Sequence, residues 1–296
     1  MNTIPKLALI IPCFNEEEII EISAQKLLSV LSDLKEKGSV SKDSYICFVD
    51  DGSTDNTWDK IQEISRNNNS IQAIRFACNF GHQKAIMAGM CENSADIYIT
   101  LDCDLQDDIE IIKEMVNKYK ENNVDVVYSV RSSREKDGFF KKITAQVFYK
   151  FCSFLGIKTL YDSADFRLVT NKVVSVLTQH NEFNLYLRAL IYKYSFKYDI
   201  VYFERQKRIG GSPKYNFISS FNLAINGITS FSIRPIRMIL ILSLLILLIS
   251  VIKKSEIFFI GGLNLFATYI IGEYLFANLI ETKNRPNYVI SEKINN

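Results

Sequence analysis

Short apolar runs alternate with longer segments of helical periodicity up to about residue 130 of the chain. The apolar runs predict buried strands at Leu7–Pro12, Tyr45–Val49, Ile71–Phe76, Ile97–Leu101 and Val124–Tyr128. The segments between them predict helices at Glu16–Glu36, Thr54–Ser65, Gly81–Asn93 and Ile109–Asn122. This alternation predicts an α/β fold with a doubly wound parallel sheet, which binds its ligands beyond the carboxyl ends of the strands.

Helix caps and the middle of the chain are less regular. Asn15 and Glu18 resemble a capping box for the first helix, and either Ser53 or Asp55 could cap the second. Further along, the pattern predicts a helix, a strand, a helix and a strand, at Phe139–Phe154, Asp165–Val169, Phe183–Tyr194 and Phe196–Glu204. A basic loop that contains glycine follows at Arg205–Tyr215.

Apolar residues are concentrated in the last quarter of the chain. Asn216–Ser232 carries them on one helical face, which predicts either an amphipathic helix in a membrane interface or a surface helix packed on the domain. Two apolar segments follow with a charged turn between them: Ile257–Ile280 is long enough to span a membrane, whereas Ile239–Ile252 is short for a span. They predict a two-helix transmembrane hairpin, with a re-entrant hairpin as the alternative.

These segments divide the chain of 296 residues into four parts. A catalytic domain is predicted at 1–215, an amphipathic juxtamembrane helix at 216–235, a transmembrane hairpin at 236–281 and a cytoplasmic tail at 282–296. Leu7–Ile11 is too short for the apolar core of a signal peptide, so the catalytic domain is expected to face the cytosol. The predicted location is therefore the cytoplasmic membrane, with several crossings and with membrane lipid as a partner.

Charge and cysteine content limit the functions and the cellular compartment that the sequence predicts. Lys and Arg number 35 against 33 Asp and Glu, so the net charge of +2 gives no argument for nucleic-acid binding. The six cysteines lack metal-ligand spacing, and several lie in apolar runs. They are expected to be buried thiols in a reducing compartment.

Carboxylates follow two of the predicted strands. Asp50 and Asp51 precede Gly52-Ser53 at the end of the second strand, where they could hold a nucleotide or simply form a turn. Asp102 and Asp104 follow the fourth strand at a spacing of two, which would put both carboxylates on one side. With Gln106 they could share Mg²⁺ or Mn²⁺, although a DxD pair is frequent in solvated loops.

Motifs in a fixed order extend over nearly the whole chain. They are IIPCFNEE at 10–17, VDDGSTD at 49–55, NFGHQ at 79–83, LDCDLQD at 101–107, ADFRL at 164–168, the basic loop from Arg208 to Tyr215, GITSFS at 227–232, IGEYL at 271–275 and KNRP at 283–286. Together they resemble family 2 glycosyltransferases of the GT-A fold. The similarity is to the polyprenyl-phosphate branch, which includes bactoprenol glucosyltransferases and dolichyl-phosphate mannose synthases.

The resemblance implies a role for individual residues. It implies a nucleotide pocket lined by Pro12, Phe14, Glu16 and Asp51. It places Asp102 against the donor, and it implies a metal held by Asp104 and Gln106 together with Asp102. Phosphate groups would be surrounded by Arg131, Arg205, Arg208 and Lys214. Asp165 would orient either the acceptor or Arg167, with a general-base role as the alternative.

The implied reaction is an inverting, metal-dependent transfer of a hexose from a nucleotide sugar to undecaprenyl or another polyprenyl phosphate, which gives a lipid-linked sugar for cell-envelope glycan modification. UDP-glucose is the first candidate donor, with GDP-mannose and modified UDP-sugars as alternatives. Related proteins also make a homotetramer an expectation. Three alternatives compete: a membrane-anchored transferase acting on a non-lipid glycan or protein, a processive polysaccharide synthase, and a non-catalytic scaffold. Trp58 is the only tryptophan, so the Gln-x-x-Arg-Trp motif of processive synthases is absent.

Overall fold

The computed structural model describes residues 4–132, 160, 163–179, 187–203, 257–282 and 286–295. Its strands are β1 (Leu7–Cys13), β2 (Tyr45–Asp50), β3 (Ile71–Phe76), β4 (Ile97–Thr100), β5 (Val126–Arg131), β6 (Ser163–Thr170), β7 (Tyr198–Phe203) and β8 (Ile290–Ile294). Its helices are α1 (Ile20–Glu36), α2 (Thr57–Asn67), α3 (His82–Cys91), α4 (Ile111–Asn122), α6 (Asn171–Leu177), α7 (Leu187–Lys193) and α10 (Ile257–Thr282).

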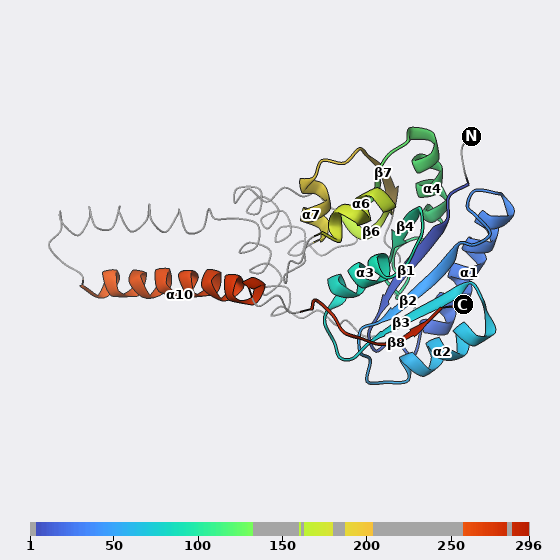
Figure 1. The fold of residues 1–296 in the computed structure, drawn as a ribbon. Helices are drawn as coiled ribbons and strands as arrows, with labels where there is room; N and C mark the ends of the chain where they lie inside the picture. Colours follow the sequence, from blue (N-terminus) through green and yellow to red (C-terminus); the bar gives the residue numbers. More distant parts are fainter. Residues whose placement is uncertain are drawn as a thin grey trace.

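The strands form one eight-stranded sheet in the order β7-β5-β6-β4-β1-β2-β3-β8 (Figure 1). The neighbours β3, β2, β1 and β4 are parallel, as the sequence predicts. The sheet is nevertheless mixed, because β6 runs antiparallel to both β4 and β5, and β8 runs antiparallel to β3. The predicted α/β architecture is confirmed, and the five strands predicted up to residue 130 all run in one direction. The antiparallel direction of β6 and the presence of β8 are not predicted.

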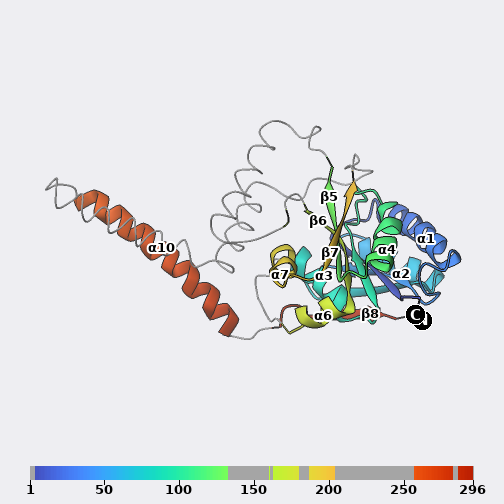
Figure 2. The ribbon, with the colours of Figure 1, turned by 90° about the horizontal axis from the view of Figure 1, so that it is seen from above.

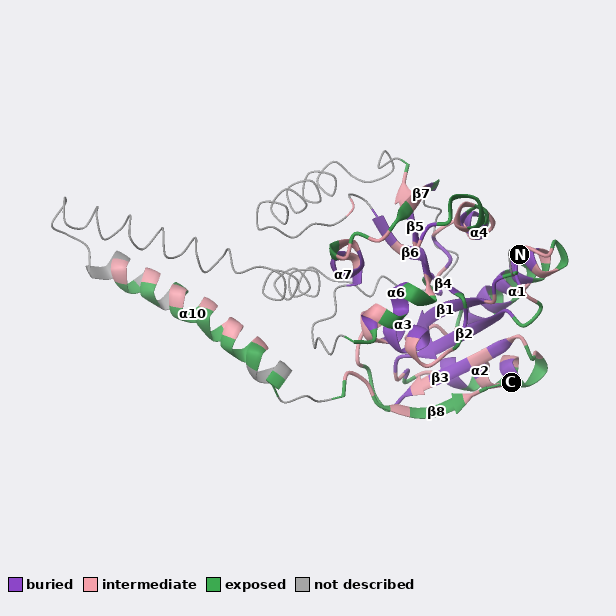
Figure 3. Ribbon diagram, turned by 45° about the horizontal axis from the view of Figure 1, so that its top comes forward, coloured by how far each residue is buried: buried purple, intermediate pink, exposed green. Residues whose placement is uncertain are grey.

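Helices cover both faces of the sheet, which explains the continuous apolar runs. Leu7, Leu9 and Ile11 of β1 belong to the core under α1, α2 and α4. Ala8 and Ile10, the alternate residues, belong to the opposite core under α3, α6 and α7. Figures 1 and 2 show these two helical layers, and Figure 3 shows the strands buried between them. A strand that is buried on both faces has no position for a solvated side chain.

The helix starts differ from the prediction. The capping box is wrong, because α1 begins at Ile20 and has no side-chain cap. Asn15 has a left-handed backbone (φ 52°), and its Oδ1 accepts a hydrogen bond from the Thr54 amide at 2.9 Å. Helix α2 is preceded by Asn56, although Asp55 Oδ1 does accept the Thr57 amide at 3.0 Å. Asn15 therefore links two loops and does not cap a helix.

The later elements match in part. Strands β6 and β7 and helix α7 lie where the sequence predicts them, whereas α6 and β8 are unpredicted. The expected helix at Phe139–Phe154, the basic loop and the amphipathic helix lie outside the described residues. Of the cysteines that the structure describes, Cys13, Cys47 and Cys103 are buried free thiols, while Cys91 is half-buried and Cys78 exposed.

The transmembrane prediction is corrected by the structure. Among the helices that the structure describes, none combines the length and the apolar character needed to cross a membrane. Helix α10 covers the second predicted span, but Asn264, Glu273 and Asn278 interrupt its apolar sequence. The first predicted span lies outside the described residues. For the part described, the predicted hairpin and the predicted multi-pass location in the cytoplasmic membrane are therefore wrong.

Candidate active site

Two loops meet beyond the carboxyl ends of β1 and β2. The Asn15 amide donates to Ser53 Oγ at 2.9 Å, and the Glu16 amide donates to Thr57 Oγ1 at 2.8 Å. Pro12 is buried at the end of β1, and Phe14 and Glu16 follow it, partly exposed. The hydroxyl groups of Ser53 and Thr57 thus accept hydrogen bonds from loop amides that would otherwise bind water. These bonds hold the loop after β1, which carries the residues predicted to bind the nucleotide.

Asp51 joins this edge to the segment before α3. Its Oδ1 accepts the Phe80 amide at 2.7 Å, and its Oδ2 accepts the Gly81 amide at 2.9 Å. Burial raises the pKa of Asp51 to about 6, although the two amides oppose the shift. Gly52 has a φ of +70°, and a side chain there would collide with the backbone of Cys78. The turns after β2 and β3 therefore fit tightly together.

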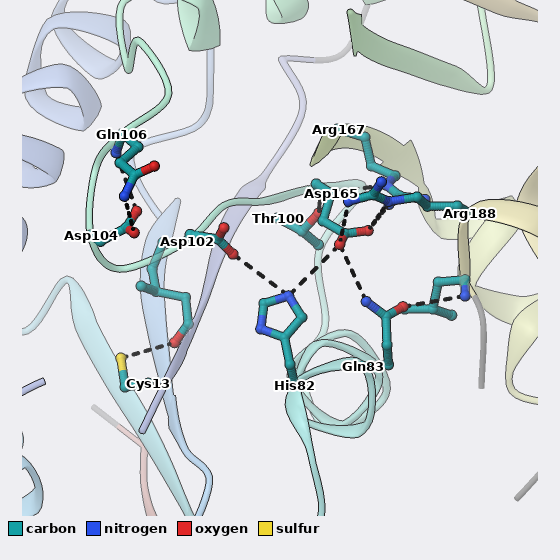
Figure 4. Close-up of polar contacts among 12 residues, drawn as sticks. Cys13, His82, Gln83, Thr100, Asp102, Asp104, Gln106, Asp165, Arg167 and Arg188 are labelled. Carbon is teal, nitrogen blue, oxygen red and sulfur yellow. Dashed lines mark hydrogen bonds and ion pairs between the residues drawn. The ribbon is translucent and has the colours of Figure 1, made fainter. Parts of the chain in front are cut away.

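The DxD pair lies in the loop after β4. Strand β4 ends at Thr100, and Asp102 and Asp104 lie in the turn after it, so strand geometry does not place their carboxylates on one side as the sequence predicts. Asp104 Oδ2 accepts the Gln106 side-chain amide at 2.9 Å, while Asp102 points toward His82 (Figure 4). The structure thus brings Asp104 and Gln106 into contact.

Asp165, near the start of β6, is held by two arginines. Arg188 of α7 forms a bidentate contact, with Nε 3.0 Å from Oδ1 and Nη2 2.9 Å from Oδ2. Arg167 of β6 donates to Oδ1 from its Nη2. The Thr100 hydroxyl donates to the Asp165 carbonyl at 2.6 Å, which ties β6 to the end of β4. The predicted pairing of Asp165 with Arg167 is therefore present.

Three further residues at this site, His82, Gln83 and Arg188, were given no site role by the sequence reasoning, although His82 and Gln83 belong to the motif NFGHQ. His82 Nε2 lies 3.6 Å from Asp102 Oδ1 and 4.0 Å from Asp165 Oδ2. The Gln83 side-chain amide donates to Asp165 Oδ2 at 3.4 Å, and its Oε1 accepts the Leu187 amide at 3.3 Å. Figure 4 shows both side chains directed from the start of α3 toward the carboxylates, with Arg188 opposite. The adjacent polar pair after Gly81 was the available signal for His82 and Gln83.

The pKa values of Asp102 and Asp165 are shifted in opposite directions. Burial raises the pKa of Asp102, although half of its side chain is accessible, and the negative charges of Asp165 and Asp104 add to the rise. Burial would raise the pKa of Asp165 too, but the guanidinium groups of Arg188 and Arg167 outweigh it, so the pKa is lowered. Asp165 is therefore a weak base.

The residues around Asp102 suit a divalent cation bound together with its substrate. Within the described part of the chain, no three His, Cys, Asp or Glu side chains are grouped to hold a metal. Asp102 and Asp104 nevertheless supply hard oxygen donors, and a cation would relieve the repulsion between them, which adds to the rise that desolvation causes in the pKa of Asp102. Mg²⁺ is commonly bound by one or two carboxylates plus substrate phosphates. The donor set fits that mode.

The predicted phosphate ligands are only partly described. Arg131 ends β5, and both β5 and β4 run antiparallel to β6. Arg131 therefore lies at the same sheet edge as the DxD loop. Arg205, Arg208 and Lys214 lie outside the described residues.

Comparison with known proteins adds a family and several relatives. The family model described as "Glycosyl transferase family 2" matches residues 8–176. The uncharacterized glycosyltransferase YkoT of Bacillus subtilis (strain 168) is 39% identical over 308 residues, covering 97% of this chain and 91% of YkoT. A prophage bactoprenol glucosyl transferase homolog of Escherichia coli (strain K12) is 33% identical, covering 96% and 98% of the two chains. The bactoprenol glucosyl transferase of Shigella phage SfII is 32% identical, covering 97% and 98%.

Proposed function

The chain belongs to glycosyl transferase family 2, and we propose that it transfers a hexose from a nucleotide sugar to the phosphate of a polyprenyl lipid. Glycosyl transfer itself follows from family membership. The candidate donor is UDP-glucose and the candidate acceptor undecaprenyl phosphate, since two relatives at 33% and 32% identity are named for bactoprenol glucosyl transfer. The proposed reaction inverts the anomeric carbon and requires Mg²⁺ or Mn²⁺.

The observation that carries this proposal is the double arginine contact of Asp165. An acceptor hydroxyl must lose its proton during transfer, and that step benefits from a base whose pKa lies near neutral pH. Arg188 and Arg167 hold the pKa of Asp165 low, so its carboxylate is a poor proton acceptor. A phosphate acceptor is already ionised at neutral pH and needs no such base. The site therefore suits a phosphate better than a sugar or protein hydroxyl.

The proposal gives the site residues separate tasks. Asp102, Asp104 and Gln106 would hold the cation, which when bound stabilises the negative charge that develops on the departing diphosphate. The nucleotide would be bound by Pro12, Phe14, Glu16 and Asp51. The phosphate groups would be bound by Arg131, Arg205, Arg208 and Lys214. Asp165 would orient Arg167 and Arg188 toward the acceptor phosphate.

The test is a transfer assay with the full chain in detergent. The protein is incubated with undecaprenyl phosphate, Mg²⁺ or Mn²⁺ and a panel of radiolabelled nucleotide sugars, and label is counted in the organic phase. We expect label from one donor, lost with EDTA and in Asp104→Ala. Asp59→Asn, which changes an exposed carboxylate on α2, is the matched control and should keep full activity.

Each other result has a definite meaning. Full activity of Asp104→Ala would refute the metal assignment. Donor binding without transfer to the lipid would refute the lipid acceptor and favour a glycan or protein acceptor. Absence of both binding and transfer would favour a non-catalytic role.

A further inference from the structure

The segment 286–295, here called the C-terminal strap, returns from α10 to the edge of the sheet. Its strand β8 pairs antiparallel with β3, with Arg75 opposite Glu292 and Phe76 opposite Ile290. The Ala77 amide donates to the Val289 carbonyl at 2.9 Å, so the pairing extends beyond the end of β3. The strap therefore contacts the start of the turn that leads from β3 to α3.

An aromatic row connects the strap to that turn. The ring of Tyr288 stacks on Phe76 at 5.3 Å between centroids, and Phe80 meets Phe76 edge-on at 5.6 Å. Phe80 and Gly81 are the residues whose amides bind Asp51. Stacked and edge-on rings attract each other in specific orientations, so Tyr288 restricts where Phe80 can lie.

The strap also holds the far end of α3. The Tyr288 hydroxyl donates to Glu92 Oε1 at 3.2 Å, and Lys293 Nζ donates to the Glu92 carbonyl at 2.6 Å. Glu92 directly follows the last residue of α3. Because the first residues of this helix, His82 and Gln83, face Asp102 and Asp165, contacts at both ends fix the helix relative to the site.

Charged side chains connect the strap to the turn after β2, which carries Asp51. Arg75 Nη1 lies 3.2 Å from Glu292 Oε1, and Arg75 Nε lies 3.4 Å from Asp50 Oδ2. Asp50 is fully buried and directly precedes Asp51. The strap thus reaches both turns at this sheet edge through one intervening side chain each. Phe76 connects it to the turn after β3, and Arg75 connects it to the turn after β2.

We propose that the C-terminal strap positions the donor pocket, with Tyr288 as the positioning residue that fixes the Phe80-Gly81 turn around Asp51 and sets the start of α3. This inference rests on the proposed function, because it assumes that the Asp51 turn binds the nucleotide. Tyr288 contacts no substrate in this scheme. It acts through Phe76 and Phe80.

The test compares Tyr288→Leu, Tyr288→Phe and Tyr119→Leu in the full chain. Tyr119 lies on α4 and packs on the opposite core, so Tyr119→Leu controls for a general loss of stability. The dissociation constant of UDP with Mn²⁺ is measured by calorimetry, with GDP as the second probe. We expect about fivefold to tenfold weaker binding in Tyr288→Leu, nearly normal binding in Tyr288→Phe and normal binding in Tyr119→Leu, because only the first loses the ring stack.

Amide hydrogen exchange gives a readout that needs no nucleotide. Exchange over residues 77–83 should accelerate in Tyr288→Leu and stay unchanged in Tyr119→Leu, because the Phe80 and Gly81 amides bind Asp51. Should Tyr288→Leu not fold, the double variant Glu292→Gln/Lys293→Met tests the same contacts at the surface, with the same expected directions.

Unchanged UDP affinity together with unchanged exchange over 77–83 would overturn the inference and leave the proposed function intact. A wild-type protein that binds neither UDP nor GDP would instead count against the proposed function. In that case, the exchange rates alone decide whether the strap holds the turn.

Discussion

Asp51 is almost completely buried and accepts hydrogen bonds from two backbone amides. Burial raises its pKa and the amides lower it, and the net rise makes the free energy of unfolding depend on pH. Only 3% of the residue is exposed, and its pKa is raised from the ordinary 3.8 to about 6. A raised pKa in the folded state means that the ionised form is disfavoured there. The stability that protonated Asp51 contributes is fully present below pH 3.8 and is lost as the pH rises through 6.

Asp51→Asn should remove this pH dependence. From pH 4 to pH 7, ionisation of Asp51 is expected to lower the free energy of unfolding of the wild type by roughly 2–3 kcal/mol. Denaturant titrations of both proteins across this range give the difference, in which all other titrating groups cancel. Curves that run parallel from pH 4 to pH 7 would show that Asp51 ionises freely in the folded protein.

Arg188 is the residue whose replacement best separates acceptor from donor. Lysine keeps the charge at this position but cannot reproduce the bidentate contact with Asp165. For Arg188→Lys we expect kcat/KM for the acceptor to fall on the order of 10- to 100-fold, because the acceptor phosphate is misplaced. The dissociation constant of the donor should change less than twofold. An equal loss in donor affinity would assign Arg188 to the donor side.

At the scale of the element, α3 approaches the sheet closely at one glycine. A side chain at Gly89 would collide with Ile10 Cγ2 and lie 3.0 Å from Val49 Cγ2. Alanine favours a helix over glycine by about 1 kcal/mol, but overpacking a core costs about 1–3 kcal/mol. The cost of overpacking is expected to exceed the gain in helix propensity, because β1 and β2 are buried on both faces and cannot move away from the added methyl group.

Gly89→Ala should therefore lower Tm by roughly 2–8 °C, as expected for a net loss of about 1–2 kcal/mol. The matched control is Gly272→Ala in α10, where none of the described atoms outside the adjoining helix backbone lies within 4 Å of the added group. That change should leave Tm unchanged or raise it slightly. Scanning calorimetry of both variants distinguishes the two effects. A Tm for Gly89→Ala equal to that of the wild type would mean that α3 can shift outward without loss.

At the scale of the whole molecule, local patterns specify the parallel half of the sheet. Strands β1 to β4 are predictable because each is a bounded apolar run, and their carboxyl ends bring Asp51 and Asp102 to one edge. Strand β8 escapes prediction because its side chains are mostly exposed and its pairing with β3 depends on residues more than 200 positions away. Periodicity does not report such distant pairing.

The same limit applies to the site. Asp104 and Gln106 are neighbours in sequence, so their contact is predictable from the motif. Arg188 meets Asp165 only after α7 packs beside β6, and His82 meets Asp102 only after α3 docks on β1. The apolar composition of the last quarter of the chain also led to a wrong prediction. The apolar sequence of α10 predicts a membrane span, whereas none of the helices that the structure describes is long and apolar enough to cross a membrane.

The proposed site draws on segments from Pro12 to Arg188, so ligand binding should stabilise the molecule as a unit. A ligand at 100 times its dissociation constant adds about 2.7 kcal/mol to the free energy of unfolding. For a chain of this size that corresponds to a rise in Tm of roughly 5–10 °C. We expect UDP with Mn²⁺ to produce this rise, and UDP with EDTA to produce much less, because Asp102 and Asp104 would then face the diphosphate without a cation.

The variant Asp104→Ala decides whether the metal acts through the DxD loop. It should keep the Tm of the unliganded wild type within a few degrees, because Asp104 is only partly buried and its described bonds are to Gln106. Its Tm with UDP should no longer respond to Mn²⁺. If Mn²⁺ still enhanced the UDP shift fully in this variant, the cation would bind elsewhere. The leaving diphosphate would then be stabilised by other groups.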